Sequence, residues 1–178
     1  MTRANFDQVL SKVTVNEAAK IGAKGNLHIT GGSLINGEQP GSATARDLVR
    51  GAIASKATLT LNLVSSDKDV DLVRADKNSS TLDLDDFASV ESYGPDPATM
   101  DSSMAAMHEM VHAFLGLGDP DRIDNAMRGY PIETGDVVDY MNTIRSELGL
   151  TPRRDYLTVK SGDRTIFDFG RPLYFTNK

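Results

Sequence analysis

The residues most able to carry out chemistry lie in a short stretch, AAMHEMVHAFL, at positions 105–115. In a helix, residues four apart share a face, so His108 and His112 can direct ring nitrogens to one point while Glu109 lies one step around. This spacing suits a metal ion held by two neutral imidazoles and one further protein ligand, with a fourth position open. Such a metal lowers the pKa of its water towards about 7, and the glutamate removes the proton as the water attacks a carbonyl.

The same stretch also permits a structural interpretation, in which two histidines lie on an ordinary amphipathic helix. The buried face of that helix would be apolar, formed by Met104, Met107, Val111 and Leu115. However, two of the three histidines in the chain have this spacing, with a glutamate after the first. Buried polar groups without partners cost about 1–3 kcal/mol each, which a bound metal would avoid. We therefore favour the metal site and expect His28 to be a surface or packing residue.

A third ligand is expected on the next helix. Glu133 lies four residues before an apolar stripe with helical spacing, which consists of Val137, Tyr140, Ile144 and Leu148. A carboxylate at the start of a core-facing stripe needs a partner, and a metal held by the preceding helix would provide one. The alternative is an interaction of Glu133 with the positive end of its own helix, worth about 0.3–1 kcal/mol. We favour the ligand role.

The elements that position these residues follow from periodicity and turn residues. One helix is predicted from about Asp101 to the glycines at 116–118, and a second over about 131–148, with Pro131 in its first turn and Gly149 past its end. Upstream, NLHITG at 26–31 alternates as a strand, and a helix capped by Ser42 or Thr44 is predicted to about 55.

The region 57–93 consists of short alternating segments and predicts a small antiparallel or mixed sheet. Its last segment, FASVESY at 87–93, is expected to offer an edge strand to an extended peptide. The tail predicts a hairpin around Ser161, Gly162 and Asp163. This order predicts an α+β domain: a small mixed or antiparallel sheet packed on the HExxH helix and on the helix that bears Glu133, followed by a C-terminal hairpin.

Composition restricts the classes of partner. The 178 residues suit a single domain over 26–178, after a loosely ordered segment 1–25 with a short helix at 16–24. The net charge of -6 without a basic run argues against nucleic acid. No window suits a membrane span, so we expect a soluble monomer. Because the chain has no cysteine, any metal must be held by histidine and carboxylate.

Two longer stretches carry a family resemblance. HEMVHAFLGLGD and IETGDVVDYMNTIRSELGLTPRRDY resemble the zinc metalloproteases of the NleD kind, which bacterial pathogens inject by type III secretion, and related metallopeptidase domains of polymorphic toxins. The likeness extends over about 105–156, and its downstream part is the more specific. The matching positions there are Glu133, Asn142, Arg145, the run 149–153 and Tyr156. Thr134 and Gly135 depart from the pattern, because glycine is unfavourable inside a helix.

The resemblance implies a gluzincin-like zinc endopeptidase with one Zn²⁺, held by His108, His112 and Glu133, and with Glu109 as general base and then acid. It also implies a secreted bacterial protein that acts in the host cell cytosol on a host protein, with signalling kinases as the known substrates of the NleD kind.

An oxyanion site is implied by a second likeness. Arg153 and Tyr156 are three residues apart and are similar to the arginine and tyrosine that stabilise the oxyanion in clostridial neurotoxin light chains. The alternative is a surface arginine and a packed tyrosine, and Tyr130 and Tyr140 are possible substitutes.

Asp119 is a rival to Glu133 as third ligand. One family of zinc proteases extends the motif with a glycine three residues and an aspartate six residues after the second histidine, but Leu115 and Gly118 occupy those positions here. Asp119 lies one residue too far, and no histidine follows it in the chain. We therefore expect it to be a turn or capping residue.

Two other functions stay open. The first is a non-catalytic, zinc-stabilised domain that binds a protein, in which four protein ligands would close the metal site. The second is a metal-free helical interaction module. Three convincing ligands, with a fourth position open, favour the protease.

Overall fold

The computed structural model describes the backbone of residues 18–21, 27–30, 41–70, 72–76, 78–93, 101–119, 135–153, 158–161, 164–168 and 172–176. Side chains are described within 41–70, 72–76, 78–88, 101–119 and 135–153. The elements in chain order are β1 (Ala18–Ile21), β2 (Leu27–Thr30), α2 (Ala43–Ala54), β3 (Thr60–Val64), β4 (Val73–Asp76), β5 (Ser79–Asp83), α3 (Leu84–Tyr93), α4 (Ser102–Leu115), α6 (Gly135–Glu147), β6 (Thr158–Ser161), β7 (Arg164–Asp168) and β8 (Pro172–Thr176).

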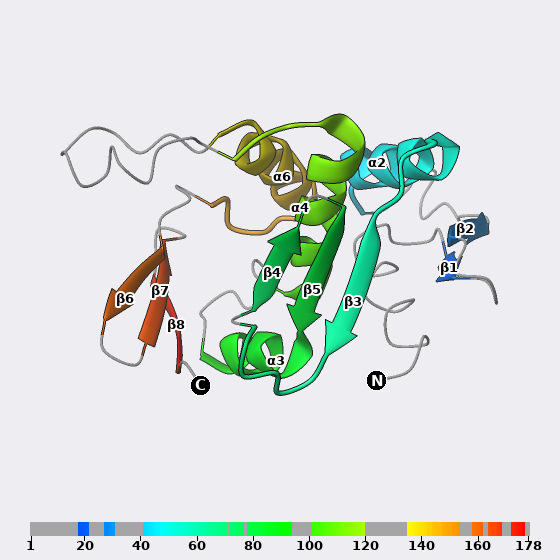
Figure 1. Ribbon diagram of the computed structural model, residues 1–178. Helices are drawn as coiled ribbons and strands as arrows, with labels where there is room; N and C mark the ends of the chain where they lie inside the picture. Colours follow the sequence, from blue (N-terminus) through cyan, green and yellow to red (C-terminus); the bar gives the residue numbers. More distant parts are fainter. Residues whose placement is uncertain are drawn as a thin grey trace.

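A three-stranded mixed sheet forms the centre of the fold (Figure 1). Strand β5 is its middle strand, with β3 parallel on one side and β4 antiparallel on the other. In β3 the leucines Leu61 and Leu63 are partly buried while Thr60 is exposed, as the alternating sequence predicts. The α+β class is therefore confirmed.

Helices α2, α4 and α6 pack together, and α4 also contacts β5. In the view of Figure 1, α4 lies behind the sheet, with α2 and α6 at its upper end. The apolar face of α4 contributes Met104, Met107 and Val111 to the main hydrophobic cluster. The other helices add Leu48, Val49, Val137, Met141 and Ile144. Helix α4 is thus fixed by contacts on several sides, which suits it to hold a site.

The predicted starts of two helices are confirmed. Each is set by a side chain that caps the first turn. Ser42 caps α2, and its hydroxyl accepts a hydrogen bond from the N–H of Ala45 at 2.9 Å. Asp101 caps α4, and its carboxylate accepts one from the N–H of Met104 at 2.9 Å. Helix α6 begins at Gly135, whose φ of 72° suits glycine. Gly135 is therefore the first residue of the helix and not an interior one. Residues 131–134 of the predicted helix lie outside the described part.

The prediction that FASVESY forms a strand is wrong, because these residues belong to helix α3. Asp83 ends β5, and its carboxylate accepts a hydrogen bond from the N–H of Asp85 at 3.1 Å, which supports a helix start. Asp85 and Asp86 in the first turn also favour the positive end of a helix. Phe87 is then buried in the core. The two edge strands of this sheet are instead β3 and β4.

The two ends of the described chain form small antiparallel sheets. The helix predicted at 16–24 is wrong for Ala18–Ile21, which forms β1 and pairs with β2. Pairing between strands has overridden local helix propensity there. The predicted C-terminal hairpin is confirmed by the pairing of Ser161 with Arg164, and β8 extends it to three strands. The proposed division at residue 25 stays a prediction.

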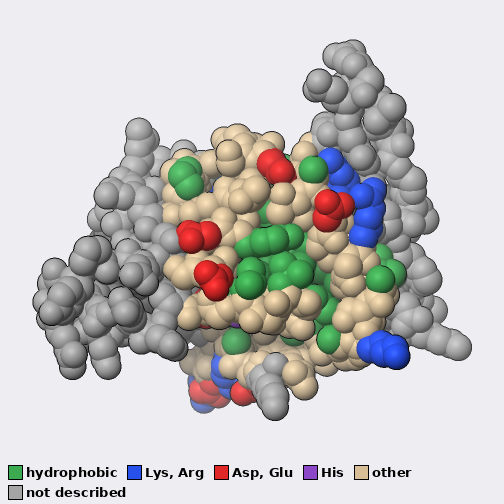
Figure 2. All heavy atoms as spheres, turned by 90° about the horizontal axis from the view of Figure 1, so that it is seen from above, with side chains coloured by type: hydrophobic (Ala, Val, Ile, Leu, Met, Phe, Trp, Pro, Cys, Tyr) green, Lys and Arg blue, Asp and Glu red, His purple; other side chains and the backbone are tan. Residues whose placement is uncertain are grey.

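The surface over the helices mixes apolar and acidic side chains. Figure 2 shows apolar side chains gathered in the middle of this face, with acidic groups beside them and basic groups near one edge. Ile53 and Leu115 are the large hydrophobic residues that are exposed within the described part. Among the described residues, no helix has the length and apolarity that a membrane crossing requires.

Candidate metal centre

Helix α4 brings His108 and His112 together on one face. The side chains are 13% and 27% exposed, so both lie at the border between core and solvent. Their Nε2 atoms are 3.1 Å apart, and the rings meet edge to face at a centroid distance of 4.8 Å. The predicted stacking of positions four apart is therefore confirmed, with both Nε2 atoms converging on one point.

The turn after α4 fixes the orientation of His112. The helix ends at Gly116, which has φ 67° and ψ 19° and donates its N–H to the His112 carbonyl at 3.1 Å. This left-handed residue reverses the chain, and the Leu117 carbonyl comes to lie 2.8 Å from His112 Nδ1. Because a carbonyl only accepts, Nδ1 carries the proton, and in the neutral ring the lone pair is on Nε2. Such an outer partner is typical of metal-binding histidines.

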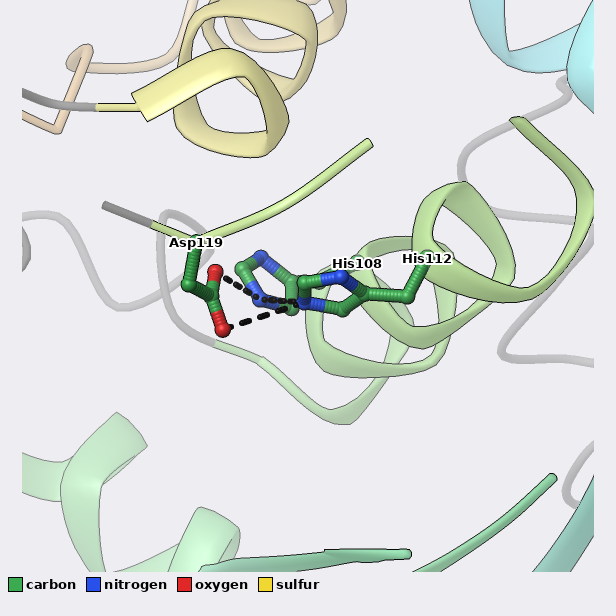
Figure 3. Close-up of side chains that lie close together, drawn as sticks. All are labelled: His108, His112 and Asp119. Atoms are coloured by element: carbon green, nitrogen blue, oxygen red, sulfur yellow. Dashed lines mark hydrogen bonds and ion pairs between the residues drawn. The ribbon is translucent and has the colours of Figure 1, made fainter. Parts of the chain in front are cut away.

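Asp119 is the third member of this group, as Figure 3 shows. Its Oδ1 is 3.4 Å from His108 Nε2, and its Oδ2 is 3.2 Å from His112 Nε2. The expectation that Asp119 is only a turn or capping residue is therefore wrong. The spacing rule failed because the left-handed Gly116 folds the chain back towards the helix, so distance along the sequence does not measure distance to the histidines.

These three residues could hold a metal ion, since one ligand atom from each lies within 4.8 Å of the others. Tetrahedral zinc with bonds of about 2.0–2.2 Å places neighbouring ligand atoms about 3.3–3.6 Å apart. The two Nε2 atoms are 3.1 Å apart, and Asp119 places Oδ2 3.2 Å from His112 and Oδ1 3.4 Å from His108, so each separation is close to that range. Two imidazole nitrogens and a carboxylate oxygen also form a donor set of the kind that zinc prefers when cysteine is absent. The residues present therefore fit the ion.

The electrostatics of the group favour a positive charge. The hydrogen bond to Asp119 raises the pKa of His112; burial opposes it, and the charges of Asp119 and Glu109 act in the same direction as the hydrogen bond. Burial acts to raise the pKa of Asp119, but the hydrogen bonds and charges of His108 and His112 outweigh it and hold that pKa well below its ordinary value. The carboxylate thus stays ionised beside the two rings.

Glu109 points from α4 towards the sheet. Its side chain is buried, and its Oε2 accepts a hydrogen bond from the Ser80 hydroxyl at 2.6 Å. Its charge lies close enough to His112 to contribute to the raised pKa of that ring. A buried carboxylate of α4 is thus held by a residue of the middle strand β5, and its charge acts on His112.

The remaining predicted site residues lie outside the described residues or on α6 and the segment that follows it. Glu133, Tyr156 and Tyr130 lie outside the described residues, so their roles stay predictions. Arg153 is buried, and its backbone N–H and carbonyl are both hydrogen-bonded to the side chain of Asn142 on α6, at 2.8 and 2.7 Å. Its role as an oxyanion donor also stays a prediction. The Tyr140 hydroxyl points to the Thr44 carbonyl of α2, 3.4 Å away.

The described residues of the downstream segment, 135–153, consist of α6 and a stretch of backbone bound to it. Arg145 is buried, which lowers its pKa to about 10 together with the charge of Arg153, while Asp101 opposes this shift. Asn142 ties the backbone at 153 to the helix. The described part of this segment therefore fixes the backbone at residue 153 against α6.

The sequence reasoning set aside one residue of the site, Asp119, and missed another, Ser80. Asp119 could have been found by treating Gly116 as a left-handed helix end that returns the chain to the helix. Ser80 left no signal in the sequence, because its contact with Glu109 depends on how β5 packs against α4.

Comparison with protein-family models, with curated proteins and with solved structures found no match.

Proposed function

We propose that this chain is a zinc-dependent endopeptidase whose ion is held by His108, His112 and Asp119. The observation that carries the proposal is the convergence of these three side chains, with the buried carboxylate of Glu109 on the same helix and its charge acting on His112. Three protein ligands leave one position of a tetrahedral ion open, which is the arrangement of catalytic zinc sites. Glu133, the third ligand that the resemblance implies, is the alternative to Asp119 at this position.

The residues have separate tasks in peptide hydrolysis. When bound, zinc would lower the pKa of water and polarise the carbonyl of the scissile bond. Glu109 accepts the proton of the attacking water and delivers it to the departing amine nitrogen. His112 is kept in the required tautomer by the Leu117 carbonyl. Arg153 and Tyr156 are the proposed oxyanion donors, by their likeness to the neurotoxin pair.

An extended substrate would bind along β4, in place of the edge strand that was expected at 87–93. Strand β4 is one of the two edge strands of the sheet, and its Ala75 lies directly opposite Ser80, the partner of Glu109. A peptide added to this edge would therefore pass one strand away from the general base. The resemblance suggests a host protein as substrate, reached by secretion into the host cytosol.

The test compares wild type, Glu109→Ala and Glu109→Gln in host-cell lysate, with N-terminal proteomics to identify new peptide ends. We expect peptides with the wild type alone, and a fall in turnover of about 10²–10⁴-fold for both variants because general base catalysis is lost. Metal analysis should give one zinc per chain in all three proteins. Cleavage retained by Glu109→Gln, or a protein that binds iron instead of zinc, would contradict the proposal.

A further inference from the structure

Ser80 lies at the middle of the central sheet. Its backbone is paired with Leu61 of β3 on one side and with Ala75 of β4 on the other. Its side chain is 1% exposed and its hydroxyl lies 2.6 Å from Oε2 of Glu109. A residue fixed by strand pairing on both sides is a rigid anchor for a partner on another element.

The direction of this hydrogen bond follows from its chemistry. An ionised carboxylate only accepts, so the Ser80 hydroxyl donates to Glu109, and a bond to a charged acceptor is short and strong. The bond engages one of the two carboxylate oxygens. Oε1 is therefore the oxygen that can accept a proton from water while Oε2 is anchored to the sheet.

We propose that Ser80 is a positioning residue for the general base. By holding Oε2 of Glu109, it sets the rotamer of the carboxylate and directs Oε1 to the water that attacks the substrate. This inference rests on the proposed function, because it assigns a role in the same hydrolysis. It adds a residue of the sheet to a site whose proposed metal ligands and general base belong to α4 and the turn that follows it.

A purely structural Ser80 would behave differently. If its hydroxyl only filled a buried polar position, removing it would lower the stability of the chain but leave the turnover of the folded enzyme unchanged. If it positions Glu109, removal should lower kcat while KM and zinc content stay the same, because neither substrate binding nor the metal ligands are altered. Loss of such an outer partner typically lowers activity by about 10–100-fold.

The experiment uses the full zinc-loaded chain and a fluorogenic peptide that contains a bond cleaved by the wild type in lysate. We expect Ser80→Ala to lower kcat by about 10–100-fold, with KM and bound zinc within about twofold of the wild type. Ser80→Thr keeps the hydroxyl and should recover most of kcat. Ser80→Cys has a similar size but a weaker donor and should resemble Ala. Ser79→Ala, the adjacent residue of β5, is the matched control and should be unchanged.

A second readout does not depend on activity. Urea unfolding of Ser80→Ala, Glu109→Ala and the double variant forms a double-mutant cycle. We expect Ser80→Ala to lower the unfolding midpoint in the wild-type background and to lower it less when Glu109 is absent. Additive effects would show that the two side chains are not coupled, and the inference would be wrong.

The outcomes separate this inference from the proposed function. If the wild type cleaves no peptide in lysate, the endopeptidase itself is wrong and the positioning role with it. If the wild type cleaves and Glu109→Ala does not, but Ser80→Ala has the kcat of the wild type, the protease stands and only the role of Ser80 is wrong. An effect on KM alone would likewise reject positioning. Because Thr adds a methyl group at a buried position, the Cys variant and the cycle decide the matter if the Thr variant is unstable.

Discussion

Two carboxylates of this protein each contact one end of a helix, and they meet different kinds of partner. Glu147, at the end of α6, accepts hydrogen bonds from the Ser42 hydroxyl and from the N–H and hydroxyl of Thr44, where α2 begins. Asp119, in the turn after α4, faces the ring nitrogens of His108 and His112. The Glu147 contact joins segments far apart in the sequence, whereas the Asp119 contact folds a turn back onto its own helix. The two carboxylates also meet different chemical groups.

The difference lies in what the partners can donate. The hydroxyl and N–H groups around Glu147 are donors at every ordinary pH, and the start of a helix favours a negative charge. A neutral imidazole has one N–H, and His112 uses its own on the Leu117 carbonyl. The group around Asp119 also lies at the C-terminal end of α4, which favours positive charge. Neutral donors thus satisfy the Glu147 contact, with a further contribution from the charge of Arg46, whereas the Asp119 group faces two ring nitrogens and supports the proposed metal.

The largest expected effect is on zinc binding. Asp119→Ala should weaken zinc affinity by at least about 100-fold, since removal of even an outer partner of a metal ligand costs about 10–100-fold. Glu147→Ala removes the other carboxylate and should leave zinc affinity unchanged. Competition titration with a chromophoric zinc chelator measures both variants.

Glu133→Ala, measured in the same titration, decides the number of ligands. Undiminished affinity in Asp119→Ala together with a loss in Glu133→Ala would return the third-ligand role to Glu133. Losses in both variants would indicate four protein ligands. Such a closed site would favour the zinc-stabilised binding domain over the protease.

A smaller effect is expected from the turn that carries Asp119. Gly116 has a φ of 67°, so Gly116→Ala should destabilise the chain by about 1–2 kcal/mol and weaken zinc binding by displacing Leu117 and Asp119. Gly118→Ala is the matched control, because an added Cβ meets nothing within 4 Å there and its φ is not in the left-handed region. Urea unfolding and zinc titration give the two quantities. Equal effects of both substitutions would show that the left-handed end of α4 does not hold the site.

The same turn shows what the sequence could and could not predict. The spacing of His108 and His112, and the ends of α4 at Asp101 and Gly116, were predictable because helix periodicity and caps are local. Asp119 was set aside because its spacing from His112 in the sequence did not fit a known ligand pattern. The left-handed Gly116 changes the path of the chain, so this spacing does not give the distance in space. An expectation based on residue spacing fails where one residue reverses the backbone.

The sheet gives the complementary case. FASVESY alternates as a strand would, yet Asp83 and the acids after it begin a helix there. Ser80 was missed because the partner of a buried serine is decided by packing between β5 and α4. Local signals therefore predicted elements and their caps, whereas contacts between elements required the structure.

The smallest expected effect concerns the Glu147 contact. Burial acts to raise the pKa of Glu147, but the hydrogen bonds from Ser42 and Thr44 outweigh it and lower the pKa below its ordinary value. A lowered carboxyl pKa contributes stability that is fully present above the unfolded pKa, about 4.3, and is lost as the pH falls through the folded value. Glu147→Gln should therefore lower stability at pH 7 by less than about 1 kcal/mol, because the side chain is exposed and screened by solvent.

The difference between Glu147→Gln and the wild type should then shrink as the pH is lowered below about 4, since the wild-type carboxylate becomes protonated there. Urea unfolding at pH 7, 5 and 3 measures this trend. Ser42→Ala is the control: it removes the cap of α2 as well as a donor to Glu147, so most of its loss should persist at every pH. A Glu147→Gln difference that stays constant down to pH 3 would mean that the charge of Glu147 does not stabilise the contact. It would also remove the contrast with Asp119, whose charge the proposed metal requires.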